Sequence, residues 1–393
     1  MTTSAPTSAS FSPSALIAGI ATISVAGFGL AVTYPLFGVR LEAMGSSGLL
    51  IGLNSAATAV SLLVGGVLLP PLMQRTGLAG LLIGASLLSA LTLLCFNLVP
   101  DPYIWIALRA VYGIGMTALF FGSELWIVSI TPPARRGFWL GLYGVCLSIG
   151  FAVGPLLLNL TGTAGWPPFL ASAAVVAGAV LPVLWAAGRV PAASQRSAPR
   201  VGAILTYFRR DPSLFFAVIL FGLIEFGGFA LFPVWGLRLG MEEAAAVLLV
   251  AVLAFGNASL QLPMGVLIDR LPFRLLLLVG ALSAVLASLA LMLVWATPVM
   301  LYLTLFGLGG LVVSLYLAPL AELGRRYQGQ ALEQGMGAMM MAYGIGALIG
   351  PPVMGRMLDG LPPHGNLWVM SAAAGIFLIL LILRWQRTRA GAA

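Results

Sequence analysis

The chain has 393 residues, of which 60% are hydrophobic and 8% charged, and its mean hydropathy is +1.06. Soluble domains are about half apolar and a quarter charged. The composition therefore indicates an integral membrane protein and excludes cytosolic enzymes, nucleic-acid-binding proteins and disulfide-rich secreted folds. The net charge of +8 rests on 19 basic residues, all of them Arg, which lie mainly in short segments between apolar runs.

Apolar runs broken by Gly, Pro and charge predict an all-α fold with twelve membrane-spanning helices, each crossing the hydrocarbon with about 20 residues. We place them at 15–38, 48–69, 78–99, 103–129, 138–160, 166–188, 213–236, 245–267, 274–295, 299–321, 335–357 and 366–385. The tail at 1–14 has no basic segment, so we expect it to be disordered and followed by a retained helix, not a cleaved signal peptide. A second short tail, at 386–393, follows the last helix.

The distribution of Arg predicts the orientation of these helices in an inner or plasma membrane. If both termini face the cytoplasm, 15 of the 19 Arg fall on that side, as the positive-inside rule requires. These are Arg75, Arg135, Arg136, Arg189, Arg196, Arg200, Arg209, Arg210, Arg270, Arg274, Arg325, Arg326, Arg384, Arg387 and Arg389. Arg40, Arg238 and Arg356 fall at the opposite ends, and Arg109 lies within a span.

The segment 189–212 is the one long polar connector, and it contains five Arg. It separates six predicted helices at 15–188 from six at 213–385. We interpret it as a cytoplasmic linker between two lobes.

The two halves repeat each other at an offset of about 196 residues. YPLFGVRL at 34–41 recurs as FPVWGLRL at 232–239, and Gln74-Arg75 recurs as Asp269-Arg270. In the fifth helix of each half, Gly141, Gly150, Gly154 and Pro155 recur as Gly337, Gly346, Gly350 and Pro351. Because six is an even number, both lobes have the same orientation, and a cavity between them can open to either side.

From 15 to 385 the chain resembles the major facilitator superfamily. The loop signature Gly-x-Leu-x-Asp-Arg-x-Gly-x-Arg is approached by Gly265, Leu267, Asp269, Arg270 and Arg274, with Pro272 in the second Gly position. Arg109 with Gly113 and Gly115 resembles the fourth-helix motif of the family. The resemblance implies a secondary transporter of a small molecule that works as a monomer without a cofactor.

Two further patterns resemble particular branches of that superfamily. The Gly-x8-Gly-x3-Gly-Pro pattern is similar to that of drug/proton antiporters, although Leu158 and Asn159 replace its closing Gly pair. The segment 123–126, followed by Arg136-Gly137, resembles bacterial facilitators with unassigned substrates.

Glu225 is the candidate for proton coupling. A charge within the bilayer costs at least about 2.5 kcal/mol, so an embedded ionisable group is a functional candidate. Glu225 lies mid-span among Phe221, Phe229 and Phe232. These surroundings favour the neutral carboxyl, as a group that loads and unloads a proton requires. The alternative is a protonated side chain with a structural hydrogen bond.

Arg109 and Glu124 share one predicted helix face with Thr117 and Phe120. Fifteen residues separate the two charges by roughly 22 Å, so they need different partners. Arg109 is expected to meet Glu225, an anionic substrate or backbone carbonyls of a neighbouring helix. For Glu124 we favour a bracing role beside Arg135 and Arg136 over contact with substrate.

Neutral polar and aromatic residues within the spans are further candidates for the cavity: Tyr34, Asn54, Asn257, Gln261 and Tyr343. The alternatives are hydrogen bonds that join helices and aromatic anchoring at the membrane surface.

The repeated motifs suggest gates. We expect Asp269 to lie against the start of the fifth helix near Gly137 and to close the cytoplasmic side, with Arg75, Arg270 and Arg274 in the same loops. Arg40 and Arg238 are expected to act similarly on the outer side, with Glu42 and Glu243 as partners. Gly150, Gly154, Pro155, Gly346, Gly350 and Pro351 should let helices pack closely and bend. Static packing is the alternative for all of these residues.

No metal, cofactor or catalytic set is predicted. Cys95 and Cys146 lie in apolar runs, His364 is the single histidine, and no phosphate-binding loop is present. The leading hypothesis is proton-coupled efflux of small amphiphilic compounds. The alternatives are transport of a small organic anion or metabolite, a receptor or scaffold that has lost transport, and a membrane-embedded enzyme.

Overall fold

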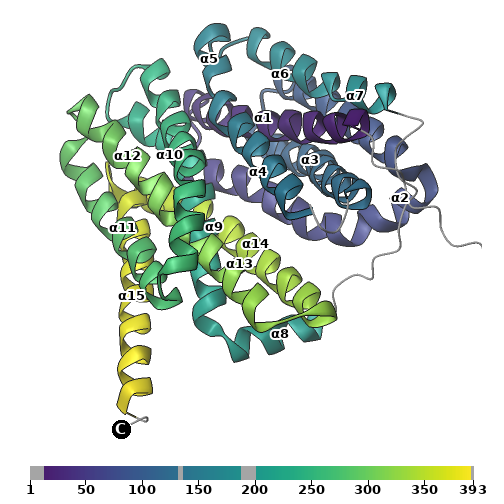
Figure 1. Ribbon diagram of the computed structural model, residues 1–393. Coiled ribbons are helices and arrows are strands. Elements are labelled where there is room, and N and C mark those ends of the chain that lie inside the picture. The colour runs from purple at the N-terminus through teal and green to yellow at the C-terminus, as the bar shows by residue number, and fades with distance from the viewer. Residues whose placement is uncertain (1–12, 132–135, 187–200, 391–393) are drawn as a thin grey trace, which may run out of the picture.

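The structure is a computed structural model that describes residues 13–131, 136–186 and 201–390 (Figure 1). The described residues form helices joined by short loops, with no strand among them. The helices are α1 (Pro13–Ala43), α2 (Gly48–Leu98), α3 (Pro102–Ile130), α4 (Arg136–Val153), α5 (Leu156–Thr161), α6 (Pro167–Gly178), α7 (Val180–Trp185), α8 (Val201–Arg210), α9 (Pro212–Arg238), α10 (Glu243–Arg270), α11 (Phe273–Val294), α12 (Pro298–Val312), α13 (Ser314–Arg326), α14 (Gly329–Gly360) and α15 (Gly365–Ala390).

Twelve helical stretches among the described residues are long and apolar enough to cross a membrane, which confirms the predicted fold class. The long helix α2 supplies two of them and changes direction at Gly77, whose φ of +70° suits a residue without a Cβ. Three spans are instead built from two short helices each: α4 with α5, α6 with α7, and α12 with α13. The orientation of the chain in the membrane remains a prediction.

The helices form two groups, α1–α7 and α9–α15, which lie side by side (Figure 1). Part of the expected linker is helical, because α8 occupies Val201–Arg210. The Tyr207 hydroxyl of α8 donates to the Ala331 carbonyl at 2.8 Å, and Phe208 stacks on Phe215 at 4.6 Å between ring centroids. These contacts with the C-terminal lobe explain the helix. Residues 187–200, with Arg189, Arg196 and Arg200, lie outside the described residues.

The sequence repeat is also a repeat of helix contacts. In the N-terminal lobe, a Cβ on Gly150 would lie 2.7 Å from the Ser24 carbonyl oxygen of α1. In the C-terminal lobe, a Cβ on Gly346 would lie 2.1 Å from the Ile219 carbonyl oxygen of α9. Gly154 and Gly350 approach Phe28 and Leu223 in the same way, so helices one repeat apart make equivalent close contacts.

Pro155 and Pro351 differ in their effect on the helix. Helix α4 ends just before Pro155 and α5 begins after it, whereas α14 continues through Pro351. The proline break is therefore present in only one of the two repeats.

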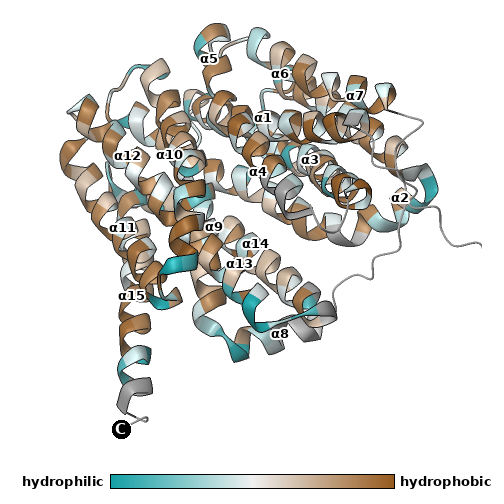
Figure 2. Cartoon of the chain, in the orientation of Figure 1, coloured by the Kyte–Doolittle hydropathy of each residue, from teal (hydrophilic) through white to brown (hydrophobic). Residues whose placement is uncertain are grey.

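The outer surface of the bundle is apolar along most of its length (Figure 2). Large side chains such as Leu91 and Leu293 are 62% and 83% exposed, as expected where a helix faces lipid. Many of the polar residues lie near helix ends, as at α8 and α2 (Figure 2).

Candidate functional site

Aromatic rings from both lobes meet at the centre of the molecule. Tyr34 of α1 contacts Phe226 of α9 at 5.7 Å and Phe229 at 5.9 Å between ring centroids. Phe151 of α4 stacks on Phe229 at 5.7 Å. Tyr343 of α14 then contacts Phe226 at 5.4 Å, which extends the cluster toward Glu225.

Glu225 is held by hydrogen bonds from two neighbouring helices. The Tyr343 hydroxyl of α14 donates to one carboxylate oxygen at 2.5 Å, and the Asn257 amide of α10 donates to the other at 3.1 Å. Both donors are neutral, and no ion pair to Glu225 is found among the described residues. A protonated carboxyl is itself a hydrogen-bond donor, whereas a carboxylate only accepts. The hydrogen bonds from Tyr343 and Asn257 must therefore rearrange when Glu225 takes up or releases a proton.

The hydrogen bonds of Glu225 continue into the other lobe. The Gln261 side-chain amide donates to the side-chain oxygen Oδ1 of Asn257 at 3.0 Å, one turn away on α10. The Ser148 hydroxyl of α4 donates to the Gln261 side-chain oxygen at 3.4 Å. The structure thus brings together the sequence candidates Glu225, Asn257, Gln261 and Tyr343. Ser148 was missed, and nothing distinguishes it in sequence from other serines within spans.

Arg109 is 1% exposed and lies among hydroxyl groups and aromatic rings of its own lobe. Its Nε donates to the Thr58 hydroxyl at 2.8 Å. Its guanidinium carbon is 4.7 Å from the ring centroid of Tyr34 and 4.8 Å from that of Phe37, which are cation–π distances. Its Nη1 has no hydrogen-bond partner within the described parts of the chain.

The predicted contact of Arg109 with Glu225 is wrong for this arrangement, since the described residues contain no such ion pair. Tyr34 packs on the guanidinium and also on Phe226, the neighbour of Glu225. The aromatic ring thus fills the space where the two charges were expected to meet.

A small cavity adjoins Arg109 and is lined from α1, α2, α3 and α9. Its polar lining consists of Thr33, Tyr34, Asn54, Ser55 and Arg109. The Asn54 amide nitrogen also has no hydrogen-bond partner within the described parts of the chain. Buried donors of this kind are costly unless something accepts from them.

The other candidates on α3 lie in different surroundings. The Thr117 hydroxyl donates to the Gly113 carbonyl at 2.8 Å, and its methyl packs at Gly65 of α2, so Thr117 belongs to a contact within the lobe. Phe120 packs half-buried against the core. Glu124 is exposed. Its predicted neighbours cannot be compared, because Arg135 and the side chain of Arg136 lie outside the described residues.

The Arg238 cluster, formed by Arg238, Glu42 and Asp359, joins the lobes at one end. Arg238 binds Glu42 with two nitrogens at 2.8 and 3.0 Å and Asp359 at 2.9 Å. Asp359 also accepts from the backbone N–H groups of Gly48 and Leu49 at 2.8 and 3.1 Å. The sequence suggested Glu42 as a partner but missed Asp359.

The repeat-related residue Arg40 behaves differently from Arg238. Its Nε is buried and has no hydrogen-bond partner among the described residues. Glu243, the second acid suggested as a partner for the two arginines, accepts from the Thr163 hydroxyl at 2.6 Å.

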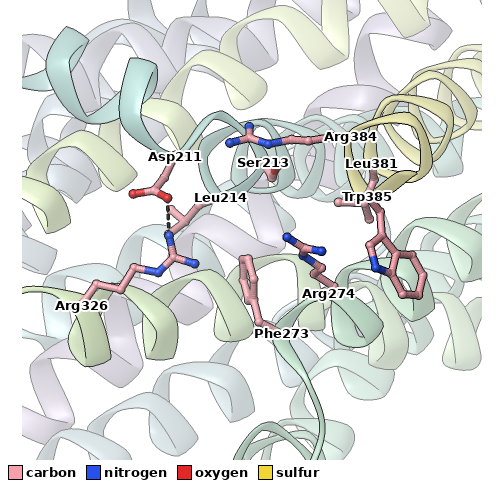
Figure 3. Close-up of a pocket in the computed structure, with 9 residues that line it drawn as sticks. All are labelled: Asp211, Ser213, Leu214, Phe273, Arg274, Arg326, Leu381, Arg384 and Trp385. Carbon is pink, nitrogen blue, oxygen red and sulfur yellow. Dashed lines mark hydrogen bonds and ion pairs between the residues drawn. The ribbon is translucent and has the colours of Figure 1, made fainter. Parts of the chain in front are cut away.

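At the opposite end, the loops with the repeated basic motif are open to solvent. Asp269 has an 83% exposed side chain and pairs with Arg325 of its own lobe at 3.5 Å. Its predicted place near Gly137 stays a prediction, because the side chains at the start of α4 lie outside the described residues. Arg75 and Arg270 are exposed. Arg274 lines a pocket at the end of α11 (Figure 3). In this arrangement Arg238 joins the lobes at one end, while Arg75, Asp269 and Arg270 at the opposite end are exposed.

Two six-helix lobes repeated in parallel, with buried ionisable groups at their junction, define a two-lobed membrane transporter. A profile of the Major Facilitator Superfamily matches residues 17–331 and 248–392, so the chain belongs to this superfamily. It is accordingly a secondary transporter of the alternating-access type and not an enzyme. It is a multi-pass membrane protein, in bacteria of the inner membrane.

Relatives of similar length are themselves uncharacterized MFS-type transporters. YfkF of Bacillus subtilis is 25% identical over 92% of this chain and 93% of its own length. YcaD of Escherichia fergusonii is 24% identical over 86% of this chain and 87% of its own length.

Solved structures show the same fold at low identity. A structure of the nucleoside transporter NupG matches with a TM-score of 0.73 at 15% identity, covering 94% of this chain and 97% of that one. A bacterial homolog of the human lysosomal transporter Spinster, in an inward-facing and unoccupied conformation, matches with a TM-score of 0.72 at 14% identity. The match covers 93% of this chain and 94% of that one.

Proposed function

We propose that this transporter couples substrate movement to protons, with Glu225 as the group that carries the proton. The observation that supports this is the position of the carboxylate, which receives hydrogen bonds from α14 and α10 at the junction of the lobes. Protonation adds a donor and removes an acceptor, so it alters both bonds. Through Asn257 and Gln261 that change reaches Ser148 of the other lobe. A proton thereby biases the contact between the lobes, as coupling requires.

We further propose that the cargo is small and amphiphilic and that it is exported. The rings around Glu225 come from both lobes, and Phe151, Phe226 and Tyr343 are only half-buried. Such rings offer apolar contact to cargo without requiring a fixed geometry. With the predicted orientation, the joined Arg238 end is the outer end, and the arrangement faces the cytoplasm, where exported cargo enters.

The test is the internal pH of proteoliposomes holding the purified protein while lipophilic cations, neutral drugs and organic anions are added in turn. We expect proton movement with amphiphilic compounds, and its loss in Glu225→Gln with counterflow exchange retained. Glu242→Gln, at an exposed residue before α10, is the matched control and should behave like the wild type. Gradient-driven accumulation that persists in Glu225→Gln would exclude Glu225 as the proton site.

A small organic anion is the second candidate for the cargo, and Arg109 is the observation in its favour. Its Nη1 and the Asn54 amide lack partners among the described residues and belong to the lining of one small cavity. A carboxylate would satisfy both groups. Arg109→Gln should then abolish counterflow of anions, and Arg109→Lys should restore part of it. Anion counterflow at the wild-type rate in Arg109→Gln would reject this candidate.

A further inference from the structure

A second pocket lies away from the lobe junction, at the ends of α9, α11, α13 and α15 (Figure 3). It encloses about 630 Å³, counting the solvent space at its mouth. Three arginines line it from three helices, Arg274, Arg326 and Arg384, with Asp211 as the one acid among the lining residues. The pocket is therefore net positive.

The single acid belongs to one side of the pocket. Asp211 pairs with Arg326 and accepts from the Tyr327 hydroxyl at 3.1 Å. Arg326 also pairs with Glu322 at 2.7 Å. Figure 3 shows the guanidinium group of Arg384 beside Ser213 and that of Arg274 between Phe273 and Trp385, while Asp211 is bonded to Arg326. Two guanidinium groups that converge with a hydroxyl form a site suited to an oxyanion, above all a phosphate.

Another part of the pocket wall is apolar. Leu381 and Trp385 of α15 line it, and the Phe273 ring lies 5.9 Å from the guanidinium carbon of Arg326. On α15 this wall continues into side chains that face outward, with Leu380 56% exposed and Leu383 47% exposed directly before Arg384. Cationic groups beside lipid-facing leucines, with a Trp at the end of the span, mark the headgroup level of a membrane. A soluble anion would make no use of this wall, whereas a phospholipid would contact both parts.

We propose that this pocket binds an anionic phospholipid, with Arg274 and Arg384 contacting the headgroup phosphate and Trp385 packing on the glycerol and the first acyl carbons. Arg326 is a positioning residue, because it is held by two carboxylates and shapes one wall. This site is independent of the role of Glu225 in transport.

The test measures retention of phosphatidylglycerol by the purified full-length protein, using native mass spectrometry during titration of the lipid into detergent. A basic residue near the membrane surface contributes about fivefold in lipid affinity, so Arg274→Gln with Arg384→Gln should weaken binding about thirtyfold. Arg356→Gln, an exposed arginine at the other end of the molecule, is the control and should bind like the wild type. If the double variant does not fold, Arg384→Gln alone should show about fivefold.

Three results would overturn the proposal. The double variant could retain phosphatidylglycerol as the wild type does, or phosphatidylcholine could bind as tightly as phosphatidylglycerol. Inorganic phosphate could also displace the lipid at matched concentration, which would make the pocket a site for the free anion. Glu225→Gln should leave lipid retention unchanged, so this result stands apart from the test of proton coupling.

Discussion

The two seams between the lobes are related by the sequence repeat, yet they are built from different chemistry. In the α2–α14 seam, backbone meets backbone: a Cβ on Gly52 would lie 2.2 Å from the Pro351 carbonyl oxygen. In the seam between α10 and α4 with α5, side chains meet instead, through Ser148 with Gln261 and Thr163 with Glu243. Close packing resists any separation of the helices, whereas single hydrogen bonds are weak, about 0.6 kcal/mol in membrane proteins.

This difference suggests a division of roles within one molecule. The α2–α14 seam and the Arg238 cluster join the lobes at one end, and the hydrogen bonds that run from Glu225 through Asn257 and Gln261 to Ser148 cross the α10 seam. In the coupling proposed above, protonation of Glu225 acts on the weaker seam, where a small free-energy change has a large effect on the contact. Pseudo-symmetric lobes need not contribute equally to the transport cycle.

The largest effect should come from filling the α2–α14 seam with Gly355→Val. A Cβ there would lie 1.9 Å from the Gly48 carbonyl oxygen, so the two backbones must separate. Overpacking costs about 1–3 kcal/mol, which shifts the balance toward the state open at this end by about fivefold to about 150-fold. The measurement is the thiol-labelling rate of a Ser55→Cys reporter in a background without Cys95 and Cys146.

The control for this variant is Gly84→Val in α2, where an added Cβ meets nothing within 4 Å. It should label at the rate of the reporter alone. Equal labelling in Gly355→Val and Gly84→Val would show that the close approach does not hold this end shut.

The second effect, about tenfold in the same labelling rate, is expected for Arg238→Gln. The two carboxylates of the Arg238 cluster would remain without their shared cation. This loss favours separation of the lobes at this end by about 1.4 kcal/mol. All three side chains are 21–23% exposed, so solvent reduces the cost below that of a fully buried pair. Arg40→Gln tests the repeat-related arginine, which makes no such bridge, and it should not increase labelling. If the labelling rate rose in Arg40→Gln and not in Arg238→Gln, Arg40 and not Arg238 would be the arginine that holds this end shut.

A third and smaller effect is expected at the weaker seam with Gln261→Leu. The variant would lose the hydrogen bonds that link Asn257 to Ser148, which costs about 0.6–1.7 kcal/mol of stability, so the thermal stability should change little. Proton movement per transported molecule should fall while counterflow persists. Thr304→Val is a suitable control, because its hydroxyl only donates to the Met300 carbonyl within its own helix. Unaltered coupling in Gln261→Leu would confine the effect of Glu225 to its own lobe.

Much of this arrangement follows from the sequence because it depends on local composition. Twelve apolar runs give twelve spans, and the i, i+4 spacing of Asn257 and Gln261 places both on one face of α10. The close contacts at Gly150 and Gly346 follow from the repeat. These features require no knowledge of how distant segments meet.

The features that sequence reasoning missed depend on contacts between distant segments. Asp359 lies 121 residues from Arg238, and the packing of α14 against α9 brings the two side chains together. Helix α8 forms on a surface supplied by Ala331 and Phe215. Glu225 was one of three partners considered for Arg109, and the two are not paired among the described residues. Charge complementarity alone could not predict the Tyr34 ring that packs on the guanidinium.

The smallest effect concerns His364, at the end of the α2–α14 seam. The Trp235 indole donates to His364 Nδ1 at 3.1 Å, which requires the neutral imidazole, and burial lowers the pKa of His364 below 6.5. The unfolded chain therefore binds this proton more readily than the folded one. The contribution to stability is fully present above pH 6.5 and is lost as pH falls through the lowered pKa.

The wild type should accordingly lose more thermal stability than His364→Asn between pH 7.5 and pH 5. The control variant Arg356→Gln, at an exposed residue, should follow the wild type. Parallel pH profiles for wild type and His364→Asn would show that the imidazole is not coupled to folding, and the seam would then depend on packing and the Arg238 cluster alone.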